Sequence, residues 1–220
     1  MSPRTIFEHE LKKLKDDVAA MGLRVEETYE ELFLALENRN KEEIVEILES
    51  DRIVNEMQRN IESRCLSLIA KQQPVARDLR MITASLKVVT DIERVGDHVS
   101  DMAELMLRLD LSPLSSYSNH LEPMMRAAKE MLRSAVNVFV ERNEEAAKSV
   151  IESDDVVDEL FNKVKQDLIE YLKKETKNAD ECIDVLMMAK YLEKIGDHAV
   201  NIAEWELFQE TGEIGDIRLL

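Results

Sequence analysis

Two stretches of this 220-residue chain each occur twice, and this repetition constrains the fold more than any other feature. The segment ERVGDHVSDMAE at 93–104 returns as EKIGDHAVNIAE at 193–204, a shift of 100 positions (93 to 193). The segment ILESDRIVNEM at 47–57 returns as VIESDDVVDEL at 150–160, a shift of 103 positions (47 to 150). The two shifts differ by nearly one helical turn. The chain is therefore predicted to consist of two related halves.

Each half is predicted to contain three long helices. Hydrophobic residues make up 45% of the chain, which has only 5 Gly and 4 Pro, and this balance favours helix. Apolar residues recur at helical spacing, and the pairs Asn40/Glu43 and Asn178/Glu181 indicate capped helix starts. The predicted helices span 5–38, 40–73, 74–109, 121–142, 143–174 and 178–211. The predicted fold class is all-α, with two tandem, structurally related antiparallel three-helix bundles.

The domain boundary is placed in the segment DLSPLSSYSNH, the only Ser- and Pro-rich stretch of the chain. We therefore expect a first three-helix repeat at 1–110, a linker at 111–120 and a second repeat at 121–220.

The charge of the chain narrows the classes of partner. A net charge of −17 and a pI near 4.7 argue against nucleic-acid binding, because that binding depends on Lys and Arg contacts to phosphate. No apolar run reaches the roughly 18 residues of a membrane span, and the charged amino terminus does not resemble a signal peptide. Cys65 and Cys182 have no CxxC neighbour, so we expect two buried, reduced thiols.

The repeated segments place carboxylates along one face of a helix. At about 100° per residue, Glu93, Asp97 and Asp101 share a face, and Val95 and Val99 lie opposite. The second copy has, at the same places, Glu193, Asp197 and Asn201. Like charges stacked in this way destabilise a helix unless a positive charge compensates them.

A second helix in each half is predicted to complete the cluster. Gly96 and Gly196 are unfavourable within helices by about 1 kcal/mol, so each is expected to allow the close approach of a neighbour. The other repeated segment supplies further oxygen ligands, at Asp51 and Asn55 in the first half and at Asp154 and Asp158 in the second. Clustered oxygens suit Mg²⁺, Ca²⁺, Mn²⁺ or iron, whereas a merely solvated acidic face remains the alternative.

Other catalytic signatures are missing from the sequence. It contains no Gly-rich phosphate loop, no GxSxG, no HExxH and no Glu-x-x-His. His98 and His198 lie about 100° around the helix from the aspartates. We therefore expect them to border the site or to make an interhelical hydrogen bond rather than to act as ligands.

Together, the segment KQQPVARDLR at 71–80, the motifs ERVGD and EKIGD and the doubled three-helix layout resemble the PhoU family, which regulates phosphate transport. The resemblance covers essentially the whole chain. It implies a cytoplasmic, non-enzymatic regulator, peripheral to a membrane transporter, that represses the phosphate-starvation response. The implied partners are the ATPase subunit of the phosphate ABC transporter and a phosphate-sensing histidine kinase. The implied cofactor is iron in multinuclear clusters, with Zn, Mn or Mg as alternatives.

The resemblance carries two metal sites onto this chain. The first comprises Asp51, Asn55, Glu93, Asp97 and Asp101. The second comprises Asp154, Asp158, Glu193, Asp197 and Asn201. Asn55 and Asn201 depart from an all-carboxylate pattern, so the two sites are expected to differ in metal number or affinity.

Three questions stay open at this point. Arg77, Asp78 and Arg80 could tie helix ends together or contact a partner, and a homodimer is neither required nor excluded. The function could instead be that of a metal-dependent phosphohydrolase that uses the same carboxylates. It could also be that of a purely structural helical scaffold.

Overall fold

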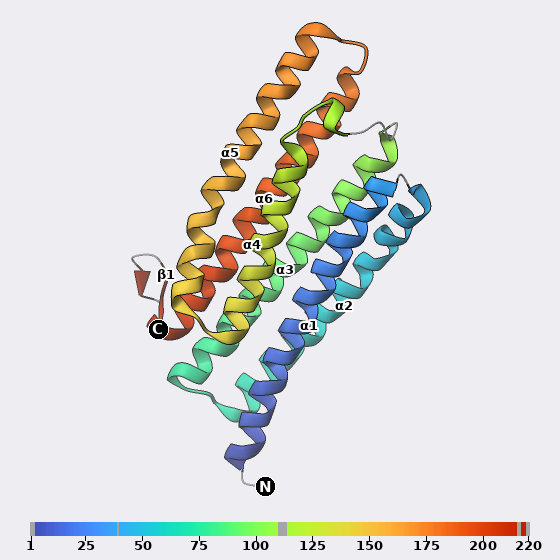
Figure 1. Cartoon of the computed structure of the whole chain (residues 1–220). Helices are drawn as coiled ribbons and strands as arrows, with labels where there is room; N and C mark the ends of the chain where they lie inside the picture. The colour runs from blue at the N-terminus through green and yellow to red at the C-terminus, as the bar shows by residue number, and fades with distance from the viewer. Residues whose placement is uncertain (1–2, 39, 110–113, 215–216, 219–220) are drawn as a thin grey trace.

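The computed structural model describes residues 3–38, 40–109, 114–214 and 217–218. Its long helices are α1 (Pro3–Asn38), α2 (Lys41–Gln72), α3 (Ala76–Arg108), α4 (Leu121–Glu141), α5 (Glu144–Lys174) and α6 (Ala179–Thr211). Helices α1–α3 form one antiparallel bundle and α4–α6 a second beside it (Figure 1). The predicted all-α fold of two three-helix bundles is confirmed. Of the predicted linker (111–120), residues 111–113 lie outside the described residues, and a short 3₁₀ helix, η1 (Leu114–Ser116), follows them.

The helix ends follow from local chemistry. The Asn40 side chain accepts hydrogen bonds from the backbone N–H groups of Glu42 and Glu43 at 3.1 and 3.3 Å, which confirms the predicted N-cap of α2. The predicted Asn178/Glu181 cap is wrong. The Asn178 side chain makes no capping bond, and Glu181 accepts a hydrogen bond from the Tyr117 hydroxyl. The Asn178 amide instead donates a hydrogen bond to the Tyr171 hydroxyl at 3.2 Å.

The predicted apolar stripe of α3 lies in the core. Val88, Ile92, Val95 and Val99 are all fully buried, and the carboxylate face of the helix points away from them. Cys65 and Cys182 are free and buried, as expected. Gly212, with a left-handed φ of 78°, is the C-cap of α6. After it, the strands β1 (Glu213–Ile214) and β2 (Ile217–Arg218) form a small antiparallel ladder that the sequence did not predict.

The two bundles meet along two antiparallel helix pairs, α3 with α6 and α1 with α4 (Figure 1). In the second pair, the Tyr29 hydroxyl donates a hydrogen bond to the Met125 carbonyl at 2.7 Å. At one end of the first pair, Arg80 donates to the carbonyls of Gln209 and Glu210 at 3.0 and 3.2 Å. The last carbonyls of a helix lack partners within the helix, so Arg80 supplies the missing hydrogen-bond donors at the end of α6.

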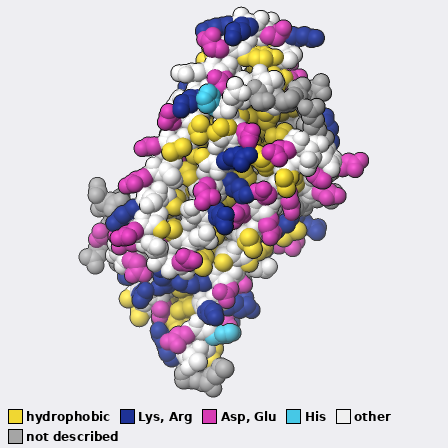
Figure 2. All heavy atoms as spheres, in the orientation of Figure 1, with side chains coloured by type: hydrophobic (Ala, Val, Ile, Leu, Met, Phe, Trp, Pro, Cys, Tyr) yellow, Lys and Arg dark blue, Asp and Glu magenta, His cyan; other side chains and the backbone are white. Residues whose placement is uncertain are grey.

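Arg77 and Asp78 also connect helix ends. Arg77 lies 3.2 Å from the Glu210 carboxylate, and Asp78 lies 3.1 Å from the guanidinium of Arg4 in α1. Their interpretation as ties between helices is therefore confirmed. Within the described part of the chain, no helix combines the length and the apolarity that a bilayer crossing requires. Figure 2 shows acidic and basic side chains interspersed over one face of the molecule rather than segregated.

Candidate metal sites

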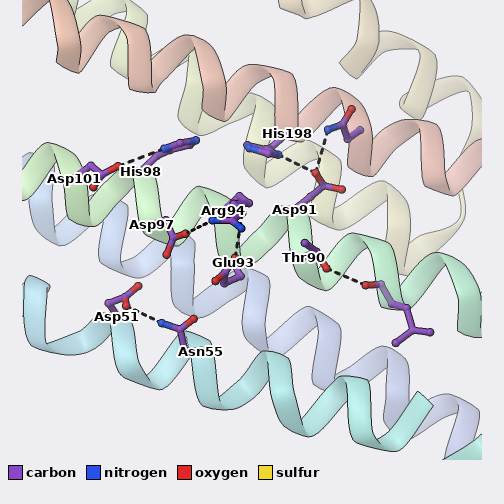
Figure 3. Close-up of polar contacts among 12 residues, drawn as sticks. Asp51, Asn55, Thr90, Asp91, Glu93, Arg94, Asp97, His98, Asp101 and His198 are labelled. Atoms are coloured by element: carbon purple, nitrogen blue, oxygen red, sulfur yellow. Dashed lines mark hydrogen bonds and ion pairs between the residues drawn. The ribbon is translucent and has the colours of Figure 1, made fainter. Parts of the chain in front are cut away.

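The first acidic cluster lies between α2 and α3. Asp51 and Asn55 project from α2 toward Glu93 and Asp97 of α3 (Figure 3). The Asn55 amide donates a hydrogen bond to Asp51 Oδ2 at 2.7 Å. The Glu93 side chain is only 15% exposed, so this acid is largely shielded from solvent although it lies opposite the apolar face of α3.

Burial and mutual repulsion disfavour ionisation in this cluster. The pKa of Asp51 is raised first by burial and then by the charge of Asp97, and the hydrogen bond from Asn55 partly offsets this. The pKa of Glu93 is raised by burial and then by Asp97. Because these effects cross from α2 to α3, the carboxylates of both helices lie within electrostatic reach of one another.

The second cluster repeats this arrangement between α5 and α6. Burial, followed by repulsion from Asp158, Asp197 and Glu193, raises the pKa of Asp154 to about 6. The Glu193 side chain is also 15% exposed. The duplicated segments therefore bring the predicted acids together twice, once in each bundle.

Both sites contain the same unsatisfied atom. Asp51 Oδ1 and Asp154 Oδ1 occupy equivalent positions in the two repeats, and both are buried without a hydrogen-bond partner. A buried oxygen of this kind costs free energy unless a ligand, an ion or water satisfies it. Each site therefore contains one buried oxygen that a bound cation would satisfy.

Gly96 and Gly196 explain how the helices approach so closely. A Cβ atom at Gly196 would lie 2.9 Å from Asp154 Oδ1, and one at Gly96 would lie 3.3 Å from Val54 Cγ1. The predicted role of both glycines, close approach of a neighbouring helix, is confirmed. In the second site, the helix backbone lies directly beneath the orphaned carboxylate.

Cations of the protein itself compensate part of the acidic charge, and the sequence analysis did not include them. Arg94 lies 2.9 Å from Asp97 and 3.7 Å from Glu93. In the second site, the Lys190 and Lys194 ammonium groups lie 2.6 and 3.2 Å from the Glu193 carboxylate. Lys194 also pairs with Asp197. The i, i+3 spacing of Arg94 and Asp97 was the signal that could have revealed this pairing.

Within the described ranges, no three His, Cys, Asp or Glu side chains converge closely enough to hold a metal ion as they stand. Asp97 and Asp197, whose charges help raise the pKa values of Asp51 and Asp154, are instead paired with Arg94 and Lys194. Metal coordination at either site therefore requires these carboxylates to turn away from their internal cations. The donor set, mostly carboxylate oxygens with an amide, suits hard cations and iron.

Two of the predicted ligands lie toward the seam between the bundles. Asn201 donates a hydrogen bond to Asp91 Oδ1 of α3 at 3.1 Å, and His198 Nδ1 lies 2.8 Å from the same oxygen. Asp101 lies close enough to Tyr191 of α6 to help raise the pKa of its phenol, after the larger effect of burial. The pairs Asp91/Asn201 and Tyr191/Asp101 are related by the repeat. The prediction of an interhelical hydrogen bond is confirmed for His198 (Figure 3).

The fold and the site define a class of protein: an all-helical, internally duplicated protein with an acidic oxygen cluster in each repeat. The PhoU domain model matches residues 18–106 and 121–205. A Clostridium acetobutylicum protein named phosphate-specific transport system accessory protein PhoU homolog is 34% identical, over 97% of this chain and 98% of the relative.

Two solved structures have the same fold. The phosphate transport system regulatory protein PhoU from Streptococcus pneumoniae aligns with a TM-score of 0.87 and 28% identity, over 96% of this chain and 100% of the other. PhoU from Pseudomonas aeruginosa aligns with a TM-score of 0.85 and 28% identity, over 94% and 100%. The chain belongs to the PhoU family, as its resemblance had indicated.

Proposed function

We propose that this protein is a cytoplasmic, metal-binding, non-enzymatic regulator of phosphate uptake and of the phosphate-starvation response. Its partners are the ATPase subunit of the phosphate ABC transporter and a phosphate-sensing histidine kinase. The regulatory role is supported by membership of the PhoU family, because its relatives are named as accessory or regulatory proteins of phosphate transport. The proposed metal binding is supported by the buried oxygens of Asp51 and Asp154, which lie at equivalent positions and have no hydrogen-bond partner.

The proposed regulation rests on competition for the same carboxylates. Asp97 and Asp197 are held by Arg94 and Lys194, whereas a bound metal ion, iron in multinuclear clusters in our proposal, supplies stronger positive charge at the same oxygens. Loading the sites frees both basic side chains for other contacts and joins α2 to α3 and α5 to α6. A partner therefore meets a different surface on the metal-loaded protein.

The test is a reporter of the phosphate-starvation response in a strain that lacks this protein. We expect the wild type to restore repression and Asp97→Asn with Asp197→Asn to fail at equal protein abundance. Asp16→Asn with Asp180→Asn removes the same charge from exposed positions outside the sites and is the matched control. Full repression by the site variant would refute a regulatory role for the clusters, and no repression by the wild type would refute the proposed function itself.

A separate prediction concerns Gly196→Ala. The added Cβ displaces the Asp154 carboxylate from its position over α6, while the gain in helix propensity is about 1 kcal/mol. We therefore expect at least tenfold weaker Mn²⁺ binding to one class of site in a calorimetric titration, with the unfolding midpoint nearly unchanged. In Gly96→Ala the added Cβ contacts Val54 rather than Asp51, so this variant is the control. Equal Mn²⁺ affinity in both variants would remove Asp154 from the ligand set.

A further inference from the structure

A groove of about 520 Å³ lies between α4 and α5, away from both acidic clusters. Much of its lining is small and uncharged. The lining includes Ala127, Ser134, Asn137, Ala146, Ser149 and Val150. Its only charged lining residues are Glu130 and Glu141.

The first repeat contains the same groove with different chemistry. It lies between α1 and α2, has a volume of about 420 Å³, and is lined by Arg24, Glu31, Leu34, Glu43, Glu46 and Ile47. Each of these residues stands 103 positions before its counterpart in the second groove, as Arg24 does before Ala127 and Glu31 before Ser134. The duplication therefore produced one groove twice, and four charged lining residues in one copy are Ala or Ser in the other.

The two grooves also differ in how their charges are satisfied. In the first, the Arg24 guanidinium lies 3.7 Å from the carboxylates of both Glu27 and Glu31, so the groove carries its own counter-charge. In the second, Glu130 and Glu141 are exposed and, among the described residues, have no ion-pair partner. They lie 11 residues apart on α4, which corresponds to roughly 16 Å along the helix.

We propose that the α4–α5 groove binds one amphipathic helix of a partner protein, with small or apolar residues against the groove and Lys or Arg beside Glu130 and Glu141. Small side chains such as Ala127 and Ser149 let a helix backbone approach closely, and a helix in a groove is a recurring mode of recognition. The two exposed carboxylates are complementary to basic residues about three helical turns apart on the partner helix. A second copy of this chain fits poorly, because its net charge is −17.

The probe is a synthetic helical peptide of about 18 residues with an Ala/Leu face and two flanking Lys residues eleven positions apart. Ala127→Arg with Ser134→Glu recreates the Arg24/Glu31 pair of the first groove without changing the net charge. Arg24→Ala with Glu31→Ser is the mirror control in the first groove. We expect peptide binding by fluorescence anisotropy to weaken at least tenfold in the former and not to weaken in the latter. Amide NMR shifts should concentrate in α4 and α5.

Three peptide-binding results would each overturn the proposal. They are no binding to the wild type, equal binding to both double variants, and equal binding of a peptide in which Glu replaces both Lys residues. Self-association of the wild type, lost in Ala127→Arg with Ser134→Glu, would assign the groove to a second copy instead. Circular dichroism and unfolding midpoints check that both variants fold, and none of these outcomes depends on metal binding.

Discussion

Glu206→Gln is expected to stabilise this protein on the order of 4 kcal/mol at pH 9 and to leave its stability at pH 4 nearly unchanged. The Glu206 side chain is 1% exposed, and its Oε1 atom is buried without a hydrogen-bond partner. Burial raises the pKa of Glu206 to about 8, although the charges of Arg142 and Lys15 oppose this. Between about pH 4.5 and pH 8, the native state therefore keeps a proton on Glu206 that the unfolded chain has already released.

The direction of the pH effect follows from proton linkage. Between about pH 4.5 and pH 8 the unfolded state binds fewer protons at Glu206 than the native state, so stability falls as the pH rises. Gln carries no proton to lose, and its amide oxygen can still accept the bond that Gln209 Nε2 donates at 2.6 Å. Urea unfolding of wild type and variant at pH 4, 6.5 and 9 measures the difference directly.

The control for this prediction is Glu37→Gln, which removes an exposed carboxylate. It is expected to change the unfolding free energy by less than about 0.5 kcal/mol at each pH. A Glu206→Gln curve that runs parallel to the wild-type curve from pH 4 to pH 9 would show that Glu206 ionises normally in the folded protein.

Gly22→Ala is expected to cost about 1–3 kcal/mol of stability, even after the helix-propensity gain of about 1 kcal/mol. A Cβ atom at Gly22 would lie 2.5 and 2.8 Å from the two Cγ atoms of Val136, where α1 packs against α4. Val136 is a stiff β-branched residue at the contact between the bundles, so it cannot turn away without moving the helix. The substitution therefore acts on the joint between the two repeats.

A double-mutant cycle with Val136→Ala separates this contact from other effects. The double variant should be more stable than the sum of the single changes predicts, with a coupling energy of about 1–2 kcal/mol, because Val136→Ala removes the clashing atoms. Chemical unfolding of the four proteins provides the comparison. Additive effects would mean that α1 and α4 shift apart freely and that Gly22 does not fix their spacing.

Much of the fold could be predicted because the signals were local or repeated. Helical periodicity defined six helices, and the predicted last helix ended at Thr211, where α6 ends. The small ladder after α6 was missed because two residues per strand leave no alternation to detect. The predicted Asn178/Glu181 cap is absent because both side chains have other partners, Tyr171 for Asn178 and Tyr117 for Glu181. Periodicity within a helix carries no information about such a competitor.

The acidic clusters were predictable in composition but not in geometry. The repeat identified which carboxylates lie on neighbouring helices, and Gly96 and Gly196 indicated that those helices approach closely. The pairing of Asn201 with Asp91 depends on how α3 packs against α6, which no pattern within one helix specifies. The same holds for the depth at which Glu93 is buried.

The most direct test of the central claim, that the two acidic clusters are metal sites, is elemental analysis of protein purified without chelator or affinity metal. The comparison is a variant that carries Asp97→Asn and Asp197→Asn. We expect the wild type to contain several equivalents of iron or another divalent metal per chain and the variant to lose most of them while remaining folded. A wild-type protein that is folded and free of metal, or a variant with undiminished metal content, would contradict the claim.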